Sequence, residues 1–369
     1  MERKVLILSC GTGEGHNSTA YAVKEALDGL NVRSEILDPL SLKSEKVRAV
    51  VSATYNNVIK KIPSAFGVVY RLGAFYDRLP LPSPVYRANS KYAFQLYNYI
   101  KINNFTEVVC THIFAMEAMT AVKRLYGNVP TYGVLTDYVV IPFFKDSDLD
   151  GYFVGTEELK RALVESGYPE KEIFCTGIPV KKGFSDDLTA ADAKSRLDIP
   201  DEKRVITVMS GGVGCGNLER LCSDLNRRFD DDFYICVLCG RNEKLKSDLD
   251  RKYRDSDKFR TVAFTREAYL YVKASEMVLT KPGGLSSTEI AVAGVPLVHL
   301  KPIPGCETYN YKYFVRNGLS MPGKTVRQAA VSARKLADDV ALRRYVIDNQ
   351  RRAIHSDSAE EIADRLTRA

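Results

Sequence analysis

The sequence predicts a protein of the α/β class that folds as two doubly wound domains. Three observations support this fold class. The chain has 369 residues, whereas a single hydrophobic core stops growing near about 250–300 residues. Short apolar runs alternate with amphipathic stretches of helical period through both halves. The order of strand, glycine-rich loop and helix occurs near the N-terminus and again after residue 205.

The first half contains short apolar runs suited to buried parallel strands. The run at 5–10 leads into a glycine turn and then into residues 17–30, a stretch with Ala20, Val23 and Leu27 on one helical face. Strands are also expected at 32–37, 108–113, 131–136, 151–155 and 173–176.

The second half repeats the pattern. A strand at 205–209 precedes a glycine loop at 211–216 and a helix at 218–229, and further strands are expected at 233–239, 261–264, 277–280 and 297–300. Gly177-Ile178-Pro179-Val180 marks the joint, because Gly and Pro together interrupt regular structure. We therefore expect domains at 1–178 and 179–345, followed by a mixed-charge helical tail at 346–369. Small-molecule sites are usually found in clefts between such domains.

The net charge of +7 is concentrated in one segment, residues 46–101, which has nine Lys or Arg, seven Tyr and a single acid, Asp77. Basic and aromatic side chains among aliphatic ones suit an element on an anionic membrane surface, with Lys60, Lys61 and Arg71 as charged contacts. A helical insertion with a solvated basic face explains the composition equally well. The rest of the chain is nearly neutral, which argues against nucleic acid as a partner.

Composition also excludes other classes of protein. No apolar run approaches the roughly 20 residues of a membrane-spanning helix, and the first ten residues favour a buried strand over a signal peptide. The eight cysteines lack the pattern of a disulfide framework, and Cys236 and Cys239 are expected to be buried thiols within a strand. These features favour a reducing, cytoplasmic compartment.

The strongest local motif is Thr-Lys-Pro-Gly-Gly-Leu-Ser-Ser-Thr-Glu at 280–289. A strand enters a glycine turn, and a helix is expected to start around 286–289, where exposed N–H groups and the helix dipole favour an anion. The carboxylate of Glu289 either binds a sugar diol or caps the first turn of this helix. The loop at 211–216 offers further backbone donors to a diphosphate. Neither loop has the P-loop signature, so ATP hydrolysis is not expected.

The first glycine turn, Gly11-Thr12-Gly13-Glu14-Gly15-His16, lacks the dinucleotide-binding spacing. It places His16 where a strand meets the N-terminus of a helix, and the positive dipole there favours the neutral imidazole. His16 is therefore a candidate general base, with a structural role as the alternative.

Together these motifs resemble those of the monogalactosyldiacylglycerol synthase and processive diacylglycerol glucosyltransferase family, relatives of MurG in glycosyltransferase family 28. The resemblance spans nearly the whole chain and rests on six motifs, at 13–16, 135–138, 177–180, 280–289, 293–296 and 301–310. It implies two Rossmann-like domains facing across a cleft (the GT-B arrangement) and a tail that crosses back to the first domain. It also implies an inverting transfer from a UDP-sugar that needs no metal or other cofactor.

Carried over by residue, the resemblance makes His16 the acceptor base and places Asp137 on the acceptor side of the cleft. Glu289 would take the ribose hydroxyls, and Glu307 and Asn310 would face the donor sugar. The full donor-binding set is Gly211, Gly212, Val213, Phe264, Gly283, Gly284, Ser286, Ser287, Thr288, Glu289, Glu307 and Asn310.

The expected activity is transfer of a hexose from UDP-glucose or UDP-galactose to diacylglycerol or a related lipid hydroxyl, on the inner face of the cell membrane. Three departures from the family pattern bear on the substrates: Ile141 and Phe144 replace a histidine and a tryptophan, and Cys306 replaces a glutamine. They leave open another acceptor, either a lipid-linked saccharide or a soluble hydroxyl compound, and nucleotide-sugar binding without transfer. The Asp-x-Asp sequences at 146–148 and 148–150 are interpreted as structural.

Overall fold

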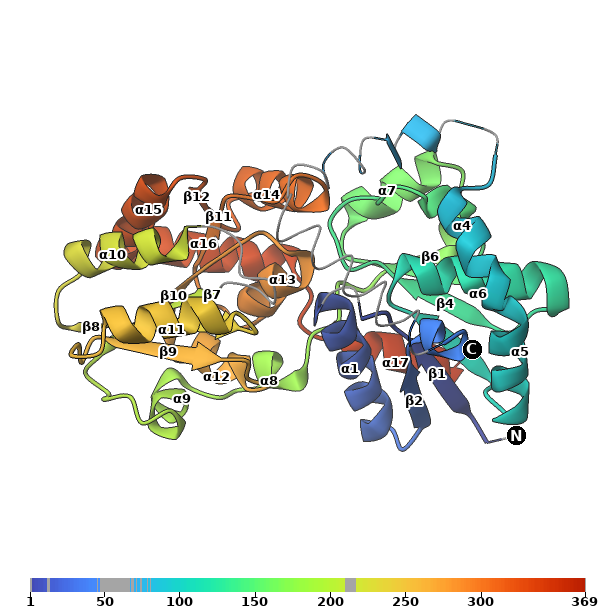
Figure 1. The fold of residues 1–369 in the computed structure, drawn as a ribbon, viewed down its shortest axis with the longest axis horizontal. Helices are drawn as coiled ribbons and strands as arrows, with labels where there is room; N and C mark the ends of the chain where they lie inside the picture. Colours follow the sequence, from blue (N-terminus) through green and yellow to red (C-terminus); the bar gives the residue numbers. More distant parts are fainter. Residues whose placement is uncertain are drawn as a thin grey trace. The chain divides into compact units, whose positions relative to one another are not determined.

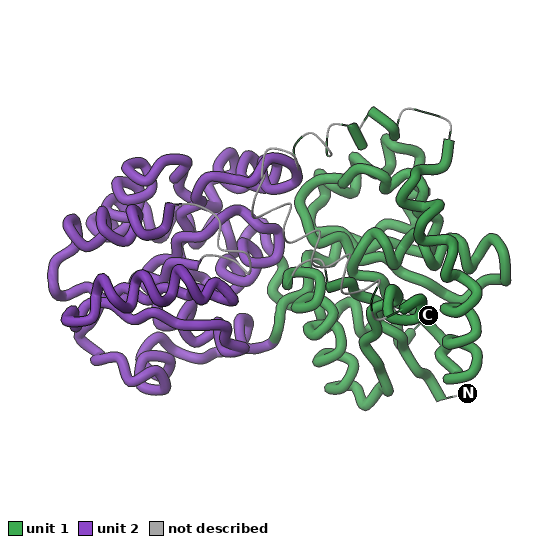
Figure 2. Tube along the Cα trace, viewed as in Figure 1, with its two compact units in different colours: residues 1–181, 355–369 green, residues 182–354 purple. Residues whose placement is uncertain are grey.

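The computed structural model describes residues 2–11, 14–44, 46, 67, 70, 72–73, 75–77, 79, 81–209 and 217–368. The chain divides into two compact units, each with a six-stranded sheet in its described part (Figures 1 and 2). Unit 1 comprises Met1–Lys181 and His355–Ala369, and unit 2 comprises Lys182–Ile354.

The sheet of unit 1 is parallel, with strand order β2-β1-β3-β4-β5-β6. Every apolar run predicted as a strand in this half forms one. The strands are β1 (Lys4–Leu8), β2 (Arg33–Leu37), β3 (Glu107–Cys110), β4 (Thr131–Val134), β5 (Gly151–Val154) and β6 (Ile173–Cys175). The described α-helices are α1 (Glu14–Gly29), α4 (Pro84–Asn89), α5 (Ala93–Ile102), α6 (Ile113–Tyr126), α7 (Glu157–Glu165) and α17 (Ser358–Arg368).

Helices cover both faces of this sheet, which explains why strands such as β1 and β5 are apolar and buried along nearly their whole length, whereas the edge strand β2 carries Arg33, Ser34 and Glu35. Val5 and Ile7 of β1 belong to a core cluster with side chains of α1 and α17. Leu6 and Leu8 point to the opposite face, because side chains alternate along a strand, and they join a cluster with residues of α5, α6 and α7.

The C-terminal helix α17 lies beside α1 (Figure 1) and completes one face of the unit 1 sheet. Ile362 and Leu366 are fully buried in the same cluster as Val23 and Leu27. The segment that leads into α17 lies against Gly177. The φ of Gly177 is +90°, and a Cβ atom added there would lie 2.9 Å from the Cβ of His355. A glycine at this position therefore allows the two segments to approach closely.

The sheet of unit 2 is also parallel, with order β12-β11-β10-β7-β8-β9. Its strands are β7 (Arg204–Met209), β8 (Phe233–Gly240), β9 (Phe259–Ala263), β10 (Ser275–Thr280), β11 (Leu297–Leu300) and β12 (Met321–Gly323). Its described helices are α8 (Lys182–Ser185), α9 (Ala190–Arg196), α10 (Leu218–Arg228), α11 (Glu243–Lys252), α12 (Ala268–Lys273), α13 (Gly284–Val292), α14 (Cys306–Arg316), α15 (Val326–Asp338) and α16 (Val340–Ala353).

The two cysteines predicted to be buried within a strand are buried in the structure. Cys236 and Cys239 are free thiols of β8, and burial raises their pKa values to about 12 and about 11. Within the described ranges, no group of three or more His, Cys, Asp and Glu side chains could hold a metal ion. No helix in the same ranges combines the length and apolar character needed to cross a membrane.

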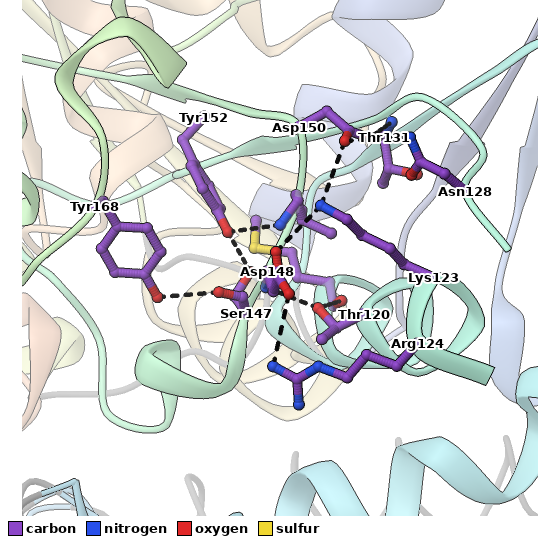
Figure 3. A network of polar contacts seen from close by, with 12 residues as sticks. Thr120, Lys123, Arg124, Asn128, Thr131, Ser147, Asp148, Asp150, Tyr152 and Tyr168 are labelled. Carbon is purple, nitrogen blue, oxygen red and sulfur yellow. Dashed lines mark hydrogen bonds and ion pairs between the residues drawn. The ribbon is translucent and has the colours of Figure 1, made fainter.

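The acidic residues before β5 form a polar network with α6 (Figure 3). Lys123 Nζ lies 3.1 Å from Asp148 Oδ1 and 3.4 Å from Asp150 Oδ1. The N–H of Thr131, the first residue of β4, donates to Asp150 Oδ2 at 2.9 Å, and the N–H of Asp148 donates to Thr120 Oγ1 at 2.9 Å. These bonds connect the start of β4, the approach to β5 and the end of α6, as expected for structural carboxylates.

Candidate active site

Ligands of parallel α/β sheets bind at the carboxyl ends of the strands, where the strand order reverses. In unit 1 this point lies between β1 and β3, and in unit 2 it lies between β7 and β10. His16 follows β1 in unit 1, and the motif at 280–289 follows β10 in unit 2. Each unit therefore carries its main predicted site residues at its own switch point.

His16 lies in the first turn of α1, and its hydrogen bonds fix its tautomer. Its Nδ1 is 2.8 Å from the backbone oxygen of Thr111, which follows β3. A carbonyl oxygen can only accept, so Nδ1 carries the hydrogen and Nε2 carries the lone pair. The hydroxyl of Thr136, which follows β4, lies 3.1 Å from the same Nδ1. The arrangement leaves Nε2 as the basic atom.

The charge state of His16 is set mainly by burial, which lowers its pKa below the usual value. The negative charge of Asp137 and the bond to Thr111 act in the opposite direction, but burial dominates. Asp137 follows β4 and is half-buried. The imidazole is thus neutral near pH 7, while a carboxylate nearby favours the imidazolium that would form on proton uptake.

A second histidine, His112, stands against the first and was not singled out from the sequence. The two rings meet edge to face, with centroids 4.6 Å apart. His112 is the N-cap of α6, and its Nδ1 accepts the N–H of Phe114 at 3.1 Å. Burial, followed by the proximity of His16, lowers its pKa well below the usual value. His112 stands within the apolar run at 108–113 that was predicted as a strand, and a histidine at the end of such a run was the signal that could have revealed it.

In unit 2, α13 begins at Gly284 with Gly283 as its N-cap. The helix was expected to start around 286–289, so it starts earlier than predicted. Glu289 consequently lies in the second turn, and its interpretation as a first-turn cap is wrong. The side chain of Glu289 is buried. Among the residues that the structure describes, none comes within 4 Å of a Cβ atom added to Gly283, which leaves open space beside the turn.

The hydroxyls of Ser287 and Thr288 are buried and donate to backbone oxygens one turn earlier. Ser287 Oγ donates to the carbonyl oxygen of Gly283 at 2.7 Å, and Thr288 Oγ1 donates to that of Gly284 at 2.8 Å. Ser286 is half-buried. The N–H groups of the first turn have no acceptor within the helix.

Glu307 and Asn310 belong to α14 and contact the turn before α13. Glu307 Oε1 is 2.5 Å from Lys281 Nζ, and its Oε2 accepts the N–H of Ile303 at 2.9 Å. Asn310 Nδ2 donates to the oxygen of Pro282 at 3.1 Å. The structure therefore brings these predicted sugar-facing residues together with the turn predicted to hold the diphosphate.

Other predicted site residues are placed as follows. Phe264 follows β9 and is 48% exposed, with the Arg241 guanidinium 5.0 Å from its ring centre. It lies at the carboxyl edge of the sheet, two strands away from β7. Predicted residues that lie outside the described part of the chain are Gly211, Gly212, Val213, Lys60, Lys61 and Arg71.

The three residues that depart from the family pattern, Ile141, Phe144 and Cys306, lie in different parts of the structure. Phe144 is 1% exposed, and its ring centre lies 5.3 Å from that of Tyr152 and 5.4 Å from that of Tyr168. Ile141 is partly buried against the same core. Cys306 is the first residue of α14 and is half-buried. Phe144 and Ile141 thus contribute to packing in unit 1.

Solved structures share this fold. MurG of Acinetobacter baumannii matches with a TM-score of 0.64 at 15% identity, over 100% of both chains. UDP-GlcNAc 2-epimerase from Neisseria meningitidis, bound to UDP-GlcNAc, matches with a TM-score of 0.62 at 12% identity, over 99% of this chain and 100% of the other. The fold is that of the GT-B glycosyltransferases.

Sequence comparisons cover both units. A processive diacylglycerol beta-glucosyltransferase of Bacillus subtilis (strain 168) is 27% identical over 329 residues, 86% of this chain and 83% of the relative. The enzyme of the same name from Bacillus cereus (strain B4264) is 29% identical over 237 residues, 63% of this chain and 61% of the relative. Residues 16–180 match the family model for monogalactosyldiacylglycerol (MGDG) synthase, and residues 205–365 match the glycosyltransferase family 28 C-terminal domain. The chain therefore belongs to the glycosyltransferases that join an MGDG synthase-type N-terminal half to a family 28 C-terminal half.

Proposed function

We propose that this glycosyltransferase moves a hexose from a UDP-sugar to diacylglycerol, with inversion, without a metal, and at an anionic membrane surface on the cytoplasmic side. Relatives named for glucosylation of diacylglycerol, similar over 86% of the chain, support this choice of acceptor. The observation that carries the chemistry is the neutral His16, whose hydrogen on Nδ1 leaves Nε2 to accept a proton.

In the proposed reaction, His16 Nε2 takes the proton of the acceptor hydroxyl. The oxygen attacks the anomeric carbon from the side opposite the nucleotide, so a C–O bond to the acceptor forms as the C–O bond to the diphosphate breaks. A single displacement of this kind inverts the configuration. The Asp137 carboxylate stabilises the imidazolium as it forms, since its charge raises the pKa of His16.

The leaving UDP needs compensation for the charge that develops on its diphosphate. The N-terminal N–H groups and dipole of α13 supply positive electrostatic potential that is already oriented before reaction. The hydroxyls of Ser287 and Thr288 are engaged by backbone oxygens, so we assign the phosphate contacts of this turn to its N–H groups and to Ser286. Glu289 is assigned to the ribose, and Glu307 and Asn310 to the hexose.

Product analysis tests the function. The protein is incubated with diacylglycerol vesicles and UDP-glucose, UDP-galactose or UDP-N-acetylglucosamine in the presence of EDTA. A β-linked hexosyl-diacylglycerol is the expected product. Transfer only to a soluble hydroxyl compound or to a lipid-linked saccharide would replace the acceptor assignment, and UDP-sugar binding without any product would overturn transfer.

Glu289→Ala tests the donor assignment separately. Loss of a buried charge-assisted hydrogen bond to the ribose should weaken UDP binding about tenfold or more in calorimetry. Glu243→Ala, at an exposed carboxylate in the first turn of α11, is the matched control and should leave UDP affinity unchanged. Equal UDP affinity in Glu289→Ala and wild type would remove Glu289 from the donor site.

A further inference from the structure

A buried histidine of unit 2, His299 on β11, bridges two hydroxyl groups. Its Nε2 lies 2.8 Å from Ser287 Oγ on α13, and its Nδ1 lies 2.9 Å from Ser320 Oγ in the segment before β12. All three side chains are buried, and that of His299 is completely so. The ring also packs edge to face on Phe314 of α14, with centres 5.0 Å apart.

The hydrogens of this group can be assigned from its partners. Ser287 has one hydroxyl hydrogen and donates it to the oxygen of Gly283. Nε2 of His299 must therefore donate to Ser287 Oγ, which leaves Nδ1 to accept the hydroxyl hydrogen of Ser320. The imidazole is neutral, since burial lowers its pKa to about 3. The result is a one-way chain of donors from Ser320 through His299 and Ser287 to Gly283.

The last acceptor in this series of hydrogen bonds, the oxygen of Gly283, determines how one peptide group is oriented. The oxygen of Gly283 accepts both the hydroxyl and the N–H of Ser287, the latter at 3.0 Å. The peptide between Gly283 and Gly284 is planar and trans, so its C=O and N–H point in opposite directions. With the oxygen held toward the helix, the N–H of Gly284 points out of the N-terminus of α13.

We propose that His299 is a positioning residue for the donor diphosphate. Acting through Ser287, it holds the first peptide of α13 so that the Gly284 N–H is directed at the phosphate. This inference rests on the proposed function, because it takes α13 as the UDP-binding helix. His299 itself does not touch the nucleotide.

Two amide substitutions separate the two ends of the imidazole. In His299→Gln the amide nitrogen reaches the former Nε2 position and still donates to Ser287, whereas the shorter His299→Asn reaches only the Nδ1 position and contacts Ser320. UDP affinity is measured by calorimetry and stability by thermal unfolding. We expect UDP affinity within about threefold of wild type for His299→Gln and about tenfold or more weaker for His299→Asn. The KM for the UDP-sugar should change in the same way.

Ser332→Ala is the matched control for loss of a buried polar group in unit 2. Its hydroxyl is buried and donates to the oxygen of Pro322, away from α13, so UDP affinity should stay unchanged even where stability falls. If His299→Asn does not fold, Ser287→Ala takes its place, with the same expected loss of UDP affinity. Equal UDP affinity in the Gln and Asn variants, or in Ser287→Ala and Ser332→Ala, would overturn the positioning role.

Wild-type protein distinguishes this inference from the proposed function. If wild-type protein binds no UDP, the donor assignment itself fails, and the positioning role fails with it. If wild-type protein binds UDP but the paired variants bind it alike, only the role of His299 is lost. If wild-type protein binds UDP and His299→Asn alone is impaired, His299 positions the turn whichever acceptor receives the sugar.

Discussion

His16 can act as a base only while its imidazole is uncharged, and burial keeps it so by lowering its pKa below 6.5. We expect kcat/KM to hold its plateau down to a pH below 6.5 and to fall only at lower pH, as the free enzyme's His16 becomes protonated. His16→Ala should reduce turnover by roughly 10²–10⁴-fold while UDP affinity is unchanged. Initial rates across pH and UDP calorimetry measure both effects.

His355→Ala provides a matched control, because His355 is exposed and lies outside the candidate site. This variant should keep both the turnover and the pH profile of wild type. An acid limb centred at or above pH 6.5, or full turnover in His16→Ala, would show that His16 does not serve as the base.

Glu117 is a buried carboxyl group of α6 whose pKa is raised to about 8 by burial, despite hydrogen bonds from Asn89 Nδ2 at 2.6 Å and Ser83 Oγ at 3.2 Å. The unfolded chain releases this proton near pH 4.5, so the folded state binds the extra proton between about pH 4.5 and 8. The free energy of unfolding should therefore fall as pH rises through this window. Denaturant titrations at pH 5 and pH 8 measure the change.

Glu117→Gln imitates the protonated side chain, with its oxygen toward Asn89 and its amide nitrogen toward Ser83. We expect this variant to raise the free energy of unfolding at pH 8 by roughly 1–3 kcal/mol and to have little effect at pH 5. Glu165→Gln, at an exposed position of α7, is the control and should retain the wild-type pH dependence. The same slope in wild type and Glu117→Gln would contradict the assignment.

Functional residues that stand in recognisable motifs could be predicted from the sequence, whereas those defined by distant partners could not. His16 was a candidate because it follows a strand and opens a helix. Glu117 and His299 lie within apolar segments, and their roles depend on Ser83 and Ser320, which lie 34 and 21 residues away along the chain. Local sequence carries no information on which distant hydroxyl reaches a buried polar side chain.

The docking of α17 depends on the absence of a side chain at Gly177. Its φ of +90° disfavours other residues, and a Cβ atom there would overlap Ser358 Oγ and lie 2.9 Å from the Cβ of His355. Gly177→Ala should destabilise the protein by about 2–4 kcal/mol and lower the hydrogen-exchange protection of α17. Denaturant unfolding and hydrogen exchange of the α17 amides measure these effects.

Gly167→Ala isolates the contribution of backbone strain. Gly167 has a similar φ of +97°, but no atom of the described part of the chain lies within 4 Å of the position of an added Cβ. This variant should cost only about 1 kcal/mol and leave α17 protected. Equal losses in the two variants would mean that strain, and not the approach of α17, explains the glycine at 177.

Whole elements were more predictable than their ends. Strands buried on both faces appear as continuous apolar runs, which is why β1 and β7 could be recognised. The edge strand β12 was not predicted, because it has three residues and contains Pro322. The start of α13 was placed too late, since Gly283 and Gly284 indicate a turn by composition although Gly284 already belongs to the helix.

For the whole molecule, the repeated order of strand, glycine loop and helix was sufficient to predict two parallel sheets. The fold alone does not determine the reaction, because an epimerase and a glycosyltransferase both match it with similar TM-scores. The distinction comes from the sequence, since both halves match glycosyltransferase family models and a similar relative is named a diacylglycerol glucosyltransferase. The tautomer of His16, on which the proposed base depends, is set by the carbonyl of Thr111, which only the folded chain brings within reach.

The uneven charge of the chain leads to a prediction about membrane binding. Lys60, Lys61 and Arg71 lie in the segment at 46–101 that contains nine basic residues and one acid. Each basic residue near an anionic surface contributes about 1 kcal/mol, so replacing all three with Gln should weaken binding to phosphatidylserine-containing vesicles about 100-fold. Vesicle co-sedimentation measures this loss, which should shrink as salt rises because ions screen the attraction. UDP affinity should not change.

The control replaces Arg196, Lys244 and Arg254, which are exposed in unit 2, and so removes the same net charge. Equal weakening in both triple variants would show that overall charge attracts the membrane, whereas unchanged binding in the first variant would make this segment a solvated face.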